Sequence, residues 1–245
     1  MSITVEICVD SVESAVAAQA GGADRVELCD NLMEGGTTPS FGSIEIARKL
    51  LDIKLHVIIR PRGGDFLYSD TEFEIMKRDI EAAKGLGVDG VVIGLLDRDG
   101  EIDVTRTAEL VELSRPMTVT FHRAFDVCAK PFAAIDQLAD IGVDRILTSG
   151  QEATAVEGLD MLADCVRHAA GRVEIIACGN LNERNIAKVI AATGVSEVHF
   201  TAFGEVASEM RHRNESVFMG GTLRPPEYSR SLTDAETVKR TIAAV

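Results

Sequence analysis

Two cysteines in this sequence each follow a glutamate at a spacing of two residues. Cys8 follows Glu6 and Cys29 follows Glu27, and both pairs lie in short runs that alternate between apolar and polar side chains. Such alternation predicts strands, and neighbouring parallel strands lie about 4.8 Å apart. Two thiolates at that separation can bind one soft, low-coordinate ion such as Cu(I). We therefore expect a metal site formed by Cys8 and Cys29, with the alternative that both are small core residues.

A second group of candidates is the pair of arginines in segment 59–66. Pro61 ends the preceding strand pattern because it lacks a backbone donor, and two glycines follow the arginines. The guanidinium groups of Arg60 and Arg62 are suited to binding an anion. In an acidic chain, however, the two arginines could equally serve to neutralise nearby carboxylates.

His122 is the third candidate, because it ends another strand pattern and is predicted to point inward. An imidazole beside Glu6 or Glu27 could carry out acid–base catalysis near neutral pH. The alternative is a structural histidine that is hydrogen-bonded to one of those carboxylates. Ser149 precedes a glycine after a later strand pattern and could help to bind an anion, although Ser-Gly is also an ordinary turn.

A weak internal repeat predicts the elements that position these residues. Four copies lie 52 to 65 residues apart, and each follows an alanine-rich amphipathic stretch and precedes a β-branched run: Gly22–Val26, Gly87–Val91, Gly142–Ile146 and Gly194–Val198. Each copy is typical of a helix C-cap, a short loop and a strand. Four further strand patterns alternate with them: Thr4–Val9, Lys54–Arg60, Met117–His122 and Val173–Cys178.

Eight alternating strand and helix units predict an α/β protein, a single TIM-type (β/α)8 barrel over residues 1–245. A doubly wound open sheet is the alternative, but no GxGxxG opens the first helix. The alternation within strands predicts a polar set of inward side chains, including Glu6, Cys8, Glu27, Cys29, Arg60, His122, Ser149, Cys178 and His199. We expect this polar set to form a site where the strands end. A long loop, 202–231, should precede the last helix as a lid or an oligomer contact.

Composition narrows the range of partners. The 245 residues include 39 acidic and 25 basic side chains, a formal charge of −14 that opposes binding to nucleic acid or to anionic membranes. The sequence opens directly on a strand pattern without a signal peptide, which predicts a cytoplasmic protein. The five cysteines are widely spaced and include no CxxC, so we expect thiols instead of disulfides.

Several of these segments together resemble the copper homeostasis protein CutC family. The likeness covers nearly the whole chain in the same order and is carried by Glu6–Ser11, Gly21–Cys29, Ile59–Phe66, Thr120–Asp126 and Leu147–Gly150. The resemblance implies a cytoplasmic, oligomeric TIM-type barrel that handles copper, with Cu(I) ligands at Cys8 and Cys29. The segment 177–180 departs from the family's usual proline and glycine run, and it adds Cys178 as a third thiol near the site.

The sequence thus leaves three hypotheses. The first is a copper homeostasis protein that binds Cu(I) through Cys8 and Cys29. The second is an enzyme acting on a small phosphorylated or carboxylated metabolite, in which Arg60, Arg62 and Ser149 hold the anion and His122 exchanges a proton with Glu6 or Glu27. The third is a structural or regulatory barrel without chemistry at its polar opening.

Overall fold

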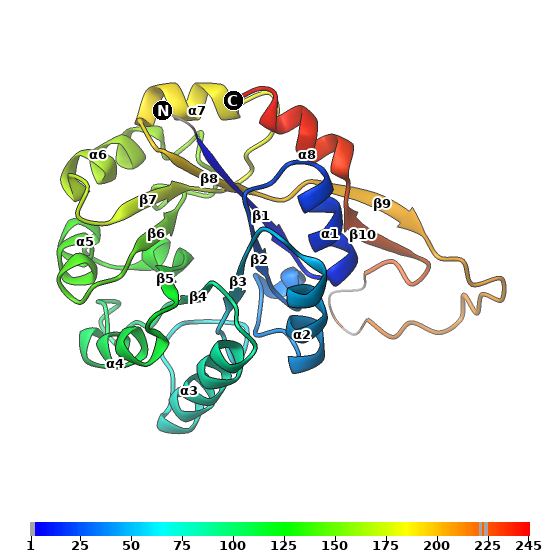
Figure 1. Cartoon of the computed structure of the whole chain (residues 1–245), viewed down its shortest axis with the longest axis horizontal. Helices are drawn as coiled ribbons and strands as arrows, with labels where there is room; N and C mark the ends of the chain where they lie inside the picture. The colour runs from blue at the N-terminus through cyan, green and yellow to red at the C-terminus, as the bar shows by residue number, and fades with distance from the viewer. Residues whose placement is uncertain (1–2, 221, 223–224) are drawn as a thin grey trace.

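Eight parallel strands close into a barrel in the computed structural model, which describes residues 3–220, 222 and 225–245. Hydrogen bonds join the strands in chain order and join β8 back to β1 (Figure 1). Closure confirms the TIM-type (β/α)8 fold and excludes the open doubly wound sheet. The strands are β1 (Thr4–Val9), β2 (Arg25–Leu28), β3 (Lys54–Ile58), β4 (Gly90–Ile93), β5 (Thr118–Phe121), β6 (Arg145–Thr148), β7 (Glu174–Ala177) and β8 (Glu197–Phe200).

Helices surround the barrel, and polar side chains cap several of their N-termini. Ser11, Ser40 and Ser69 each accept a hydrogen bond from a backbone N–H in the first turn, as expected of N-cap residues. The helices are α1 (Val12–Ala20), α2 (Phe41–Leu50), α3 (Asp70–Gly85), α4 (Val104–Ser114), α5 (Pro131–Asp140), α6 (Leu159–Ala169), α7 (Ile186–Thr193) and α8 (Ala235–Ile242), with short 3-10 turns at Leu32–Glu34 and Arg123–Val127. Among the described residues, no helix combines the length and apolarity needed to cross a membrane.

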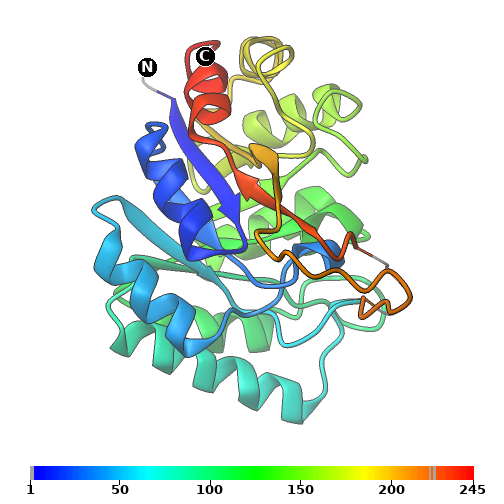
Figure 2. The same cartoon turned by 90° about the vertical axis from the view of Figure 1, so that its right-hand side faces the viewer.

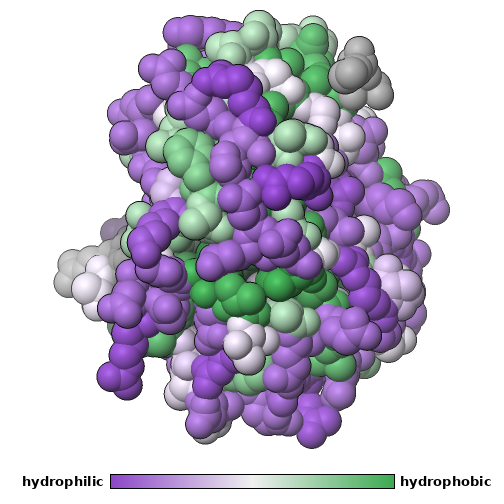
Figure 3. Space-filling model, turned by 90° about the vertical axis from the view of Figure 1, so that its left-hand side faces the viewer, coloured by the Kyte–Doolittle hydropathy of each residue, from purple (hydrophilic) through white to green (hydrophobic). Residues whose placement is uncertain are grey.

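The outer layer of the barrel is conventional, because apolar strand residues pack under the helices while polar groups dominate the exterior. Figure 3 shows one side of the molecule, where hydrophilic side chains cover most of the surface around limited apolar patches. The internal repeat is confirmed as a marker of strands, since its four copies lead into β2, β4, β6 and β8. The other four strands also form, although β3 ends at Ile58, two residues before the predicted end at Arg60.

Two strands lie at the ends of segment 202–231, which the sequence predicts to be a long loop. Strand β9 (Phe203–Ala207) pairs antiparallel with β10 (Ser229–Thr233), so that Phe203 lies opposite Thr233 and Ala207 opposite Ser229. This ribbon lies beside α1, where the backbone N–H of Thr233 donates to Ser14 Oγ at 3.0 Å, and it leads outward from the barrel (Figures 1 and 2). The sequence analysis missed both strands, because the ribbon is largely exposed and lacks the apolar alternation of a buried strand. Its role as a lid or oligomer contact stays a prediction.

Charged and polar side chains fill much of the barrel interior. Glu6, Arg25, His56 and Glu197 are all at least nine-tenths buried between the strands. Gly90 makes room for one of them, because a Cβ at this position would lie 2.5 Å from His56 Nε2 and 2.7 Å from Thr118 Oγ1. The glycine in β4 therefore permits an imidazole to occupy the interior.

We expect the substitution Gly90→Ala to destabilise the fold by about 1–3 kcal/mol, because the added methyl group overpacks a buried site. Gly85→Ala is a matched control, since a Cβ at Gly85 meets no atom within 4 Å and its backbone is not left-handed. That control should be neutral or stabilising by up to about 1 kcal/mol. Urea unfolding of the two variants measures both effects, and equal stability would contradict this account of the interior.

Candidate functional site

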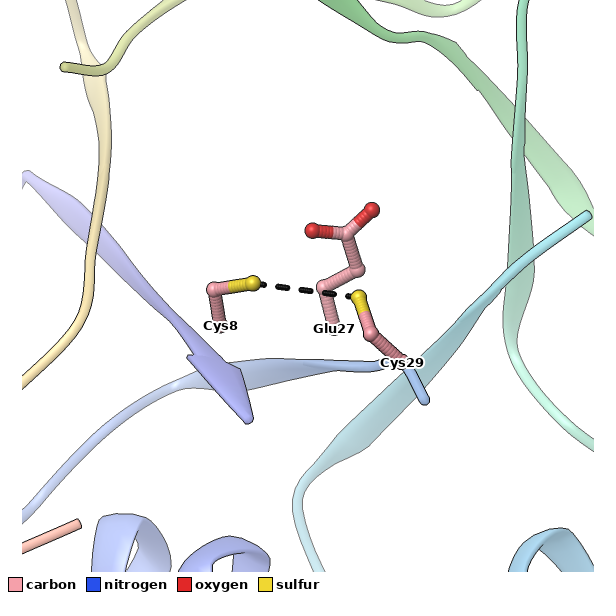
Figure 4. A group of neighbouring side chains, drawn as sticks. All are labelled: Cys8, Glu27 and Cys29. Carbon is pink, nitrogen blue, oxygen red and sulfur yellow. Dashed lines mark hydrogen bonds between the residues drawn. The ribbon is translucent and has the colours of Figure 1, made fainter. Parts of the chain in front are cut away.

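Two thiols face one another at the end of the barrel where the strands terminate. Cys8 lies on β1 and Cys29 directly follows β2, and the two sulfurs are 3.8 Å apart (Figure 4). Glu27 on β2 pairs in register with Cys8 and points into the same space. One ligand atom from each of the three side chains lies within 4.8 Å of the other two, and all three residues are buried. This arrangement can hold one metal ion.

A network of buried charges lies directly beneath the thiols. The Glu6 carboxylate accepts hydrogen bonds from Arg25 Nε and, at 2.7 Å, from His199 Nδ1. Arg25 in turn donates to Glu197, 2.5 Å away. The other ring nitrogen of His199 lies 3.6 Å from Glu27. His199 thus links the structural carboxylate Glu6 to the group that contains the thiols.

This environment shifts the pKa values of Cys8, Cys29, Glu27 and His199 in different directions. A hydrogen bond with Cys29 and, to a smaller extent, the contact with His199 lower the pKa of Cys8 to about 6, despite the opposing effect of burial. The same hydrogen bond raises the pKa of Cys29. Burial and the nearby Cys8 sulfur raise the pKa of Glu27 well above its ordinary value. Burial alone would lower the pKa of His199, but its hydrogen bonds to Cys8 and Glu6 raise it instead. These contacts therefore favour the thiolate form of Cys8 and the protonated form of His199.

The thiols line one wall of a cavity of about 380 Å³ at this end of the barrel. Other lining side chains come from the ends of β3 and β5 and from the loops that follow them, and Ile58 of β3 packs against the two thiols. The lining residues include Cys8, Glu27, Cys29, Leu32, Ile58, Arg60, Phe66, His122, Arg123, Asp126 and His199. The structure thus brings six of the eight residues predicted for the site to one region, since Glu6 lies directly below the cavity and contacts His199.

His122 lies in this cavity wall, but among the described residues it contacts neither Glu6 nor Glu27. Its Nδ1 accepts a hydrogen bond from the backbone N–H of Ala124 at 3.1 Å, and its ring packs 4.9 Å from the Phe66 ring. Burial, assisted by the charge of Arg60, lowers the pKa of His122 to about 3. The imidazole is therefore neutral at physiological pH, and it is His199, not His122, that lies close to both Glu6 and Glu27.

The two candidate arginines occupy different environments. Arg60 is buried and donates to the backbone carbonyls of Glu34, Gly36 and Gly64, so it joins the loop after β2 to the loop after β3. Arg62 does not line the cavity. Its guanidinium is partly exposed and donates to Glu72, near the start of α3, at 2.6 Å. Only Arg60 of this pair is positioned to act on a molecule in the cavity.

Ser149 and Cys178 also lie outside the cavity lining. The Ser149 hydroxyl is buried in hydrogen bonds with Asp126, Arg123 and the carbonyl of Glu152. Cys178 packs against apolar side chains of β6 and β7, and burial raises its pKa well above the ordinary value. Neither residue joins the thiol pair.

His199 is the functional candidate to which the sequence analysis assigned no role. It sits between Val198 and Phe200, so the strand alternation correctly predicted that it faces inward. Its partners could not be read from that pattern, because its contact with Glu6 joins strands at opposite ends of the chain.

The two neutral buried histidines make stability depend on pH. Burial lowers the pKa of His56 to about 4 and that of His122 to about 3, whereas both take up protons near pH 6.5 in the unfolded chain. At these two sites the unfolded state binds more protons in this window, so their contribution to the free energy of unfolding should fall as pH drops from about 6.5 towards 4. Each histidine contributes a slope of up to about 1.4 kcal/mol per pH unit.

We expect His122→Asn to make this pH dependence shallower, as measured by urea unfolding between pH 7 and pH 4. The exposed His212 provides the control, because His212→Asn should leave the slope unchanged. A slope that is identical in His122→Asn and the parent protein would contradict the assignment of a neutral, buried His122.

Comparison with known proteins places this geometry in a family. The chain matches the CutC family over residues 3–204. It is 52% identical to a family protein CutC of Bacteroides thetaiotaomicron over 241 residues, which cover 98% of this chain and 97% of that protein. It is 47% identical to the human copper homeostasis protein cutC homolog, again over 241 residues, which cover 98% of this chain and 88% of the human protein.

Solved structures agree with these sequence matches. The crystal structure of CutC from Streptococcus agalactiae superposes with a TM-score of 0.78 at 36% identity, covering 81% of this chain and 98% of that one. Thiamine phosphate pyrophosphorylase from Pyrococcus furiosus superposes with a TM-score of 0.59 at 15% identity, covering 99% of this chain and 95% of that one, a likeness of fold alone. On the extent of the family match and the identity of its relatives, the chain belongs to the CutC family of copper homeostasis proteins.

Proposed function

We propose that this protein binds Cu(I) through Cys8 and Cys29 at the C-terminal opening of the barrel and acts in copper homeostasis as a cytoplasmic homo-oligomer. The observation that carries the proposal is the 3.8 Å separation of the two buried sulfurs. Thiolates are soft ligands that select Cu(I), and membership of a copper homeostasis family agrees with that choice.

The spacing of the sulfurs also bears on the coordination. If each metal–sulfur bond is about 2.3 Å, as in zinc thiolates, sulfurs 3.8 Å apart subtend roughly 110° at the ion. That angle is too small for a linear two-coordinate complex and leaves space for a third donor. The Glu27 carboxylate is the candidate, since its oxygen lies within 4.8 Å of both sulfurs.

The lowered pKa of Cys8 favours metal binding, because the thiolate is the form that coordinates a metal ion. Cys8 is already a thiolate at neutral pH, so copper binding needs to displace a proton only from Cys29 and, if it coordinates, from Glu27. The retained charge is stabilised by His199, which Glu6 holds in place. Metal affinity should therefore rise with pH above neutrality.

Competition with a chromogenic Cu(I) chelator tests this site. We expect one equivalent of Cu(I) per chain, and a loss of affinity of more than about 100-fold in the Cys8→Ala/Cys29→Ala double variant, a greater loss than removal of outer-shell contacts usually causes. The matched control is Cys128→Ala/Cys165→Ala, which removes two buried thiols outside the cavity lining. Equal affinity in the two double variants would refute the proposal.

The cavity supports a second candidate function. A volume of about 380 Å³ falls within the range of small-molecule sites and far exceeds the space that one ion needs. We propose as the alternative an enzyme that acts on a small anionic metabolite, with Arg60 beside the anion. His199 replaces His122 as the proton-transfer group in this proposal, because it contacts Glu6 and lies near Glu27.

Incubating metal-free protein with pools of phosphorylated and carboxylated metabolites, followed by mass spectrometry, tests the enzyme proposal. We expect conversion of one compound, and a rate at least about 100-fold lower in His199→Gln, as is typical when an acid–base group is removed. His168→Gln, on the outer helix α6, is the control and should keep the full rate. The absence of any conversion by folded protein would count against an enzyme.

A further inference from the structure

Two residues that line the cavity, His122 and Arg60, each have a buried nitrogen without a hydrogen-bond partner. Within the described part of the chain, neither His122 Nε2 nor Arg60 Nε has a hydrogen-bond acceptor, and both residues are 5% exposed. Leaving a buried donor unpaired costs roughly 1–3 kcal/mol, so such atoms are rare in folded proteins. Two of them in one cavity wall indicate a position where an acceptor is expected.

The tautomer of His122 follows from its backbone contact. Its Nδ1 accepts the N–H of Ala124, so in the neutral ring the proton must reside on Nε2. His122 Nε2 is therefore a donor, and its natural partner is an oxygen atom. Because the ring is neutral, that oxygen need not belong to a charged group.

Arg60 adds a charge that the protein does not neutralise. Its guanidinium donates to three backbone carbonyls and interacts with the Tyr68 hydroxyl, but among the described residues it forms no ion pair with a carboxylate. Arg123, the other arginine of the cavity, is by contrast paired with Asp126 at 2.6 Å. A buried cation without a counter-ion is unfavourable, and an anion in the cavity would supply the missing charge.

Phe66 joins these two donors into one site. Its ring lies 4.9 Å from the His122 ring and 5.2 Å from the Arg60 guanidinium carbon, so both polar groups pack against the same aromatic side chain. Phe66 is only partly buried and follows Gly63 and Gly64, of which Gly64 has a left-handed backbone. A small displacement of this ring would give a molecule in the cavity access to both donors.

We propose that this side of the cavity binds a small organic carboxylate that carries a second oxygen, with the carboxylate against Arg60 and the second oxygen accepting from His122 Nε2. The inference deepens the second candidate function by naming a ligand class, and it does not depend on copper binding. One uncompensated guanidinium matches one negative charge. A phosphate dianion fits less well, because one guanidinium leaves its second charge unmatched.

The test uses pyruvate, propionate and inorganic phosphate as probes of metal-free protein. Pyruvate has the carboxylate and a second oxygen, whereas propionate has the carboxylate alone. Calorimetry should give an affinity for pyruvate about tenfold above that for propionate, the value of one well-formed hydrogen bond. The Nε2 resonance of His122 in ¹⁵N-histidine spectra should shift on addition of pyruvate.

Two substitutions at His122 separate ligand binding from structure. His122→Asn keeps an acceptor for the Ala124 N–H but cannot reach the Nε2 position, so the preference for pyruvate over propionate should disappear. His122→Gln places an amide donor near the Nε2 position and should restore part of that preference. A mere loss of packing would weaken the binding of pyruvate and propionate equally and leave the ratio of their affinities unchanged.

Repeating the titration in the Cys8→Ala/Cys29→Ala variant distinguishes this proposal from the copper proposal, since carboxylate binding should persist without the thiols. Three results would overturn it: a pyruvate preference that survives His122→Asn, phosphate binding in the absence of carboxylate binding, or a His122 signal that no probe moves. The last result would identify the Phe66 ring as the partner of the imidazole N–H.

Discussion

The buried Glu6 carboxylate is the interaction on which the interior of this barrel depends. A carboxylate that is 1% exposed is stable only if its lost hydration is replaced, and Arg25 and His199 provide the replacement. Arg25 is itself balanced by Glu197, which also accepts from Arg145. Removing one member would leave a buried charge unpaired, at a typical cost of about 3–5 kcal/mol. The network is therefore present as a whole or not at all.

The same network determines what the cavity above it can do. Because Glu6 occupies His199 Nδ1, the other nitrogen of the ring faces Glu27 and the thiols. A cation held in this place favours a thiolate on Cys8, whereas a neutral histidine would favour two protonated thiols. The protonation of the thiols at the opening of the barrel thus depends on the ion pair between Glu6 and His199, which lies one layer of side chains below them.

The fold and the inward direction of several site residues could be predicted from the sequence, because both depend on local periodicity. The four-fold repeat marks strand starts, and the two-residue period of each strand places Cys8, Cys29 and His122 inward. The partners of these residues could not be predicted, since they depend on the register between strands that are distant in sequence. Glu6 and His199 are 193 residues apart and meet only because β8 closes onto β1.

Arg62 illustrates a different limit of sequence reasoning. Its position beside Arg60 suggested a shared role, but the capping box of α3 places Glu72 within reach, and the exposed guanidinium pairs with it. An arginine near the start of a helix can thus pair with a capping glutamate instead of binding a ligand, and the sequence spacing does not distinguish the two roles. Arg60 differs because its guanidinium donates to backbone carbonyls of the two loops and forms no ion pair with Glu72.

The cavity has two sides whose chemistries are complementary. Cys8, Cys29 and Glu27 form a group that could hold a metal ion, and an ion bound there would leave the donors of His122 and Arg60 without partners. A carboxylate ligand would satisfy those donors but needs no thiol. Since both sides line one cavity of about 380 Å³, an organic ligand on the His122 side would lie next to an ion on the Cys8 side. The two proposals therefore assign different ligands to different side chains of one cavity, and neither ligand uses the groups that the other needs.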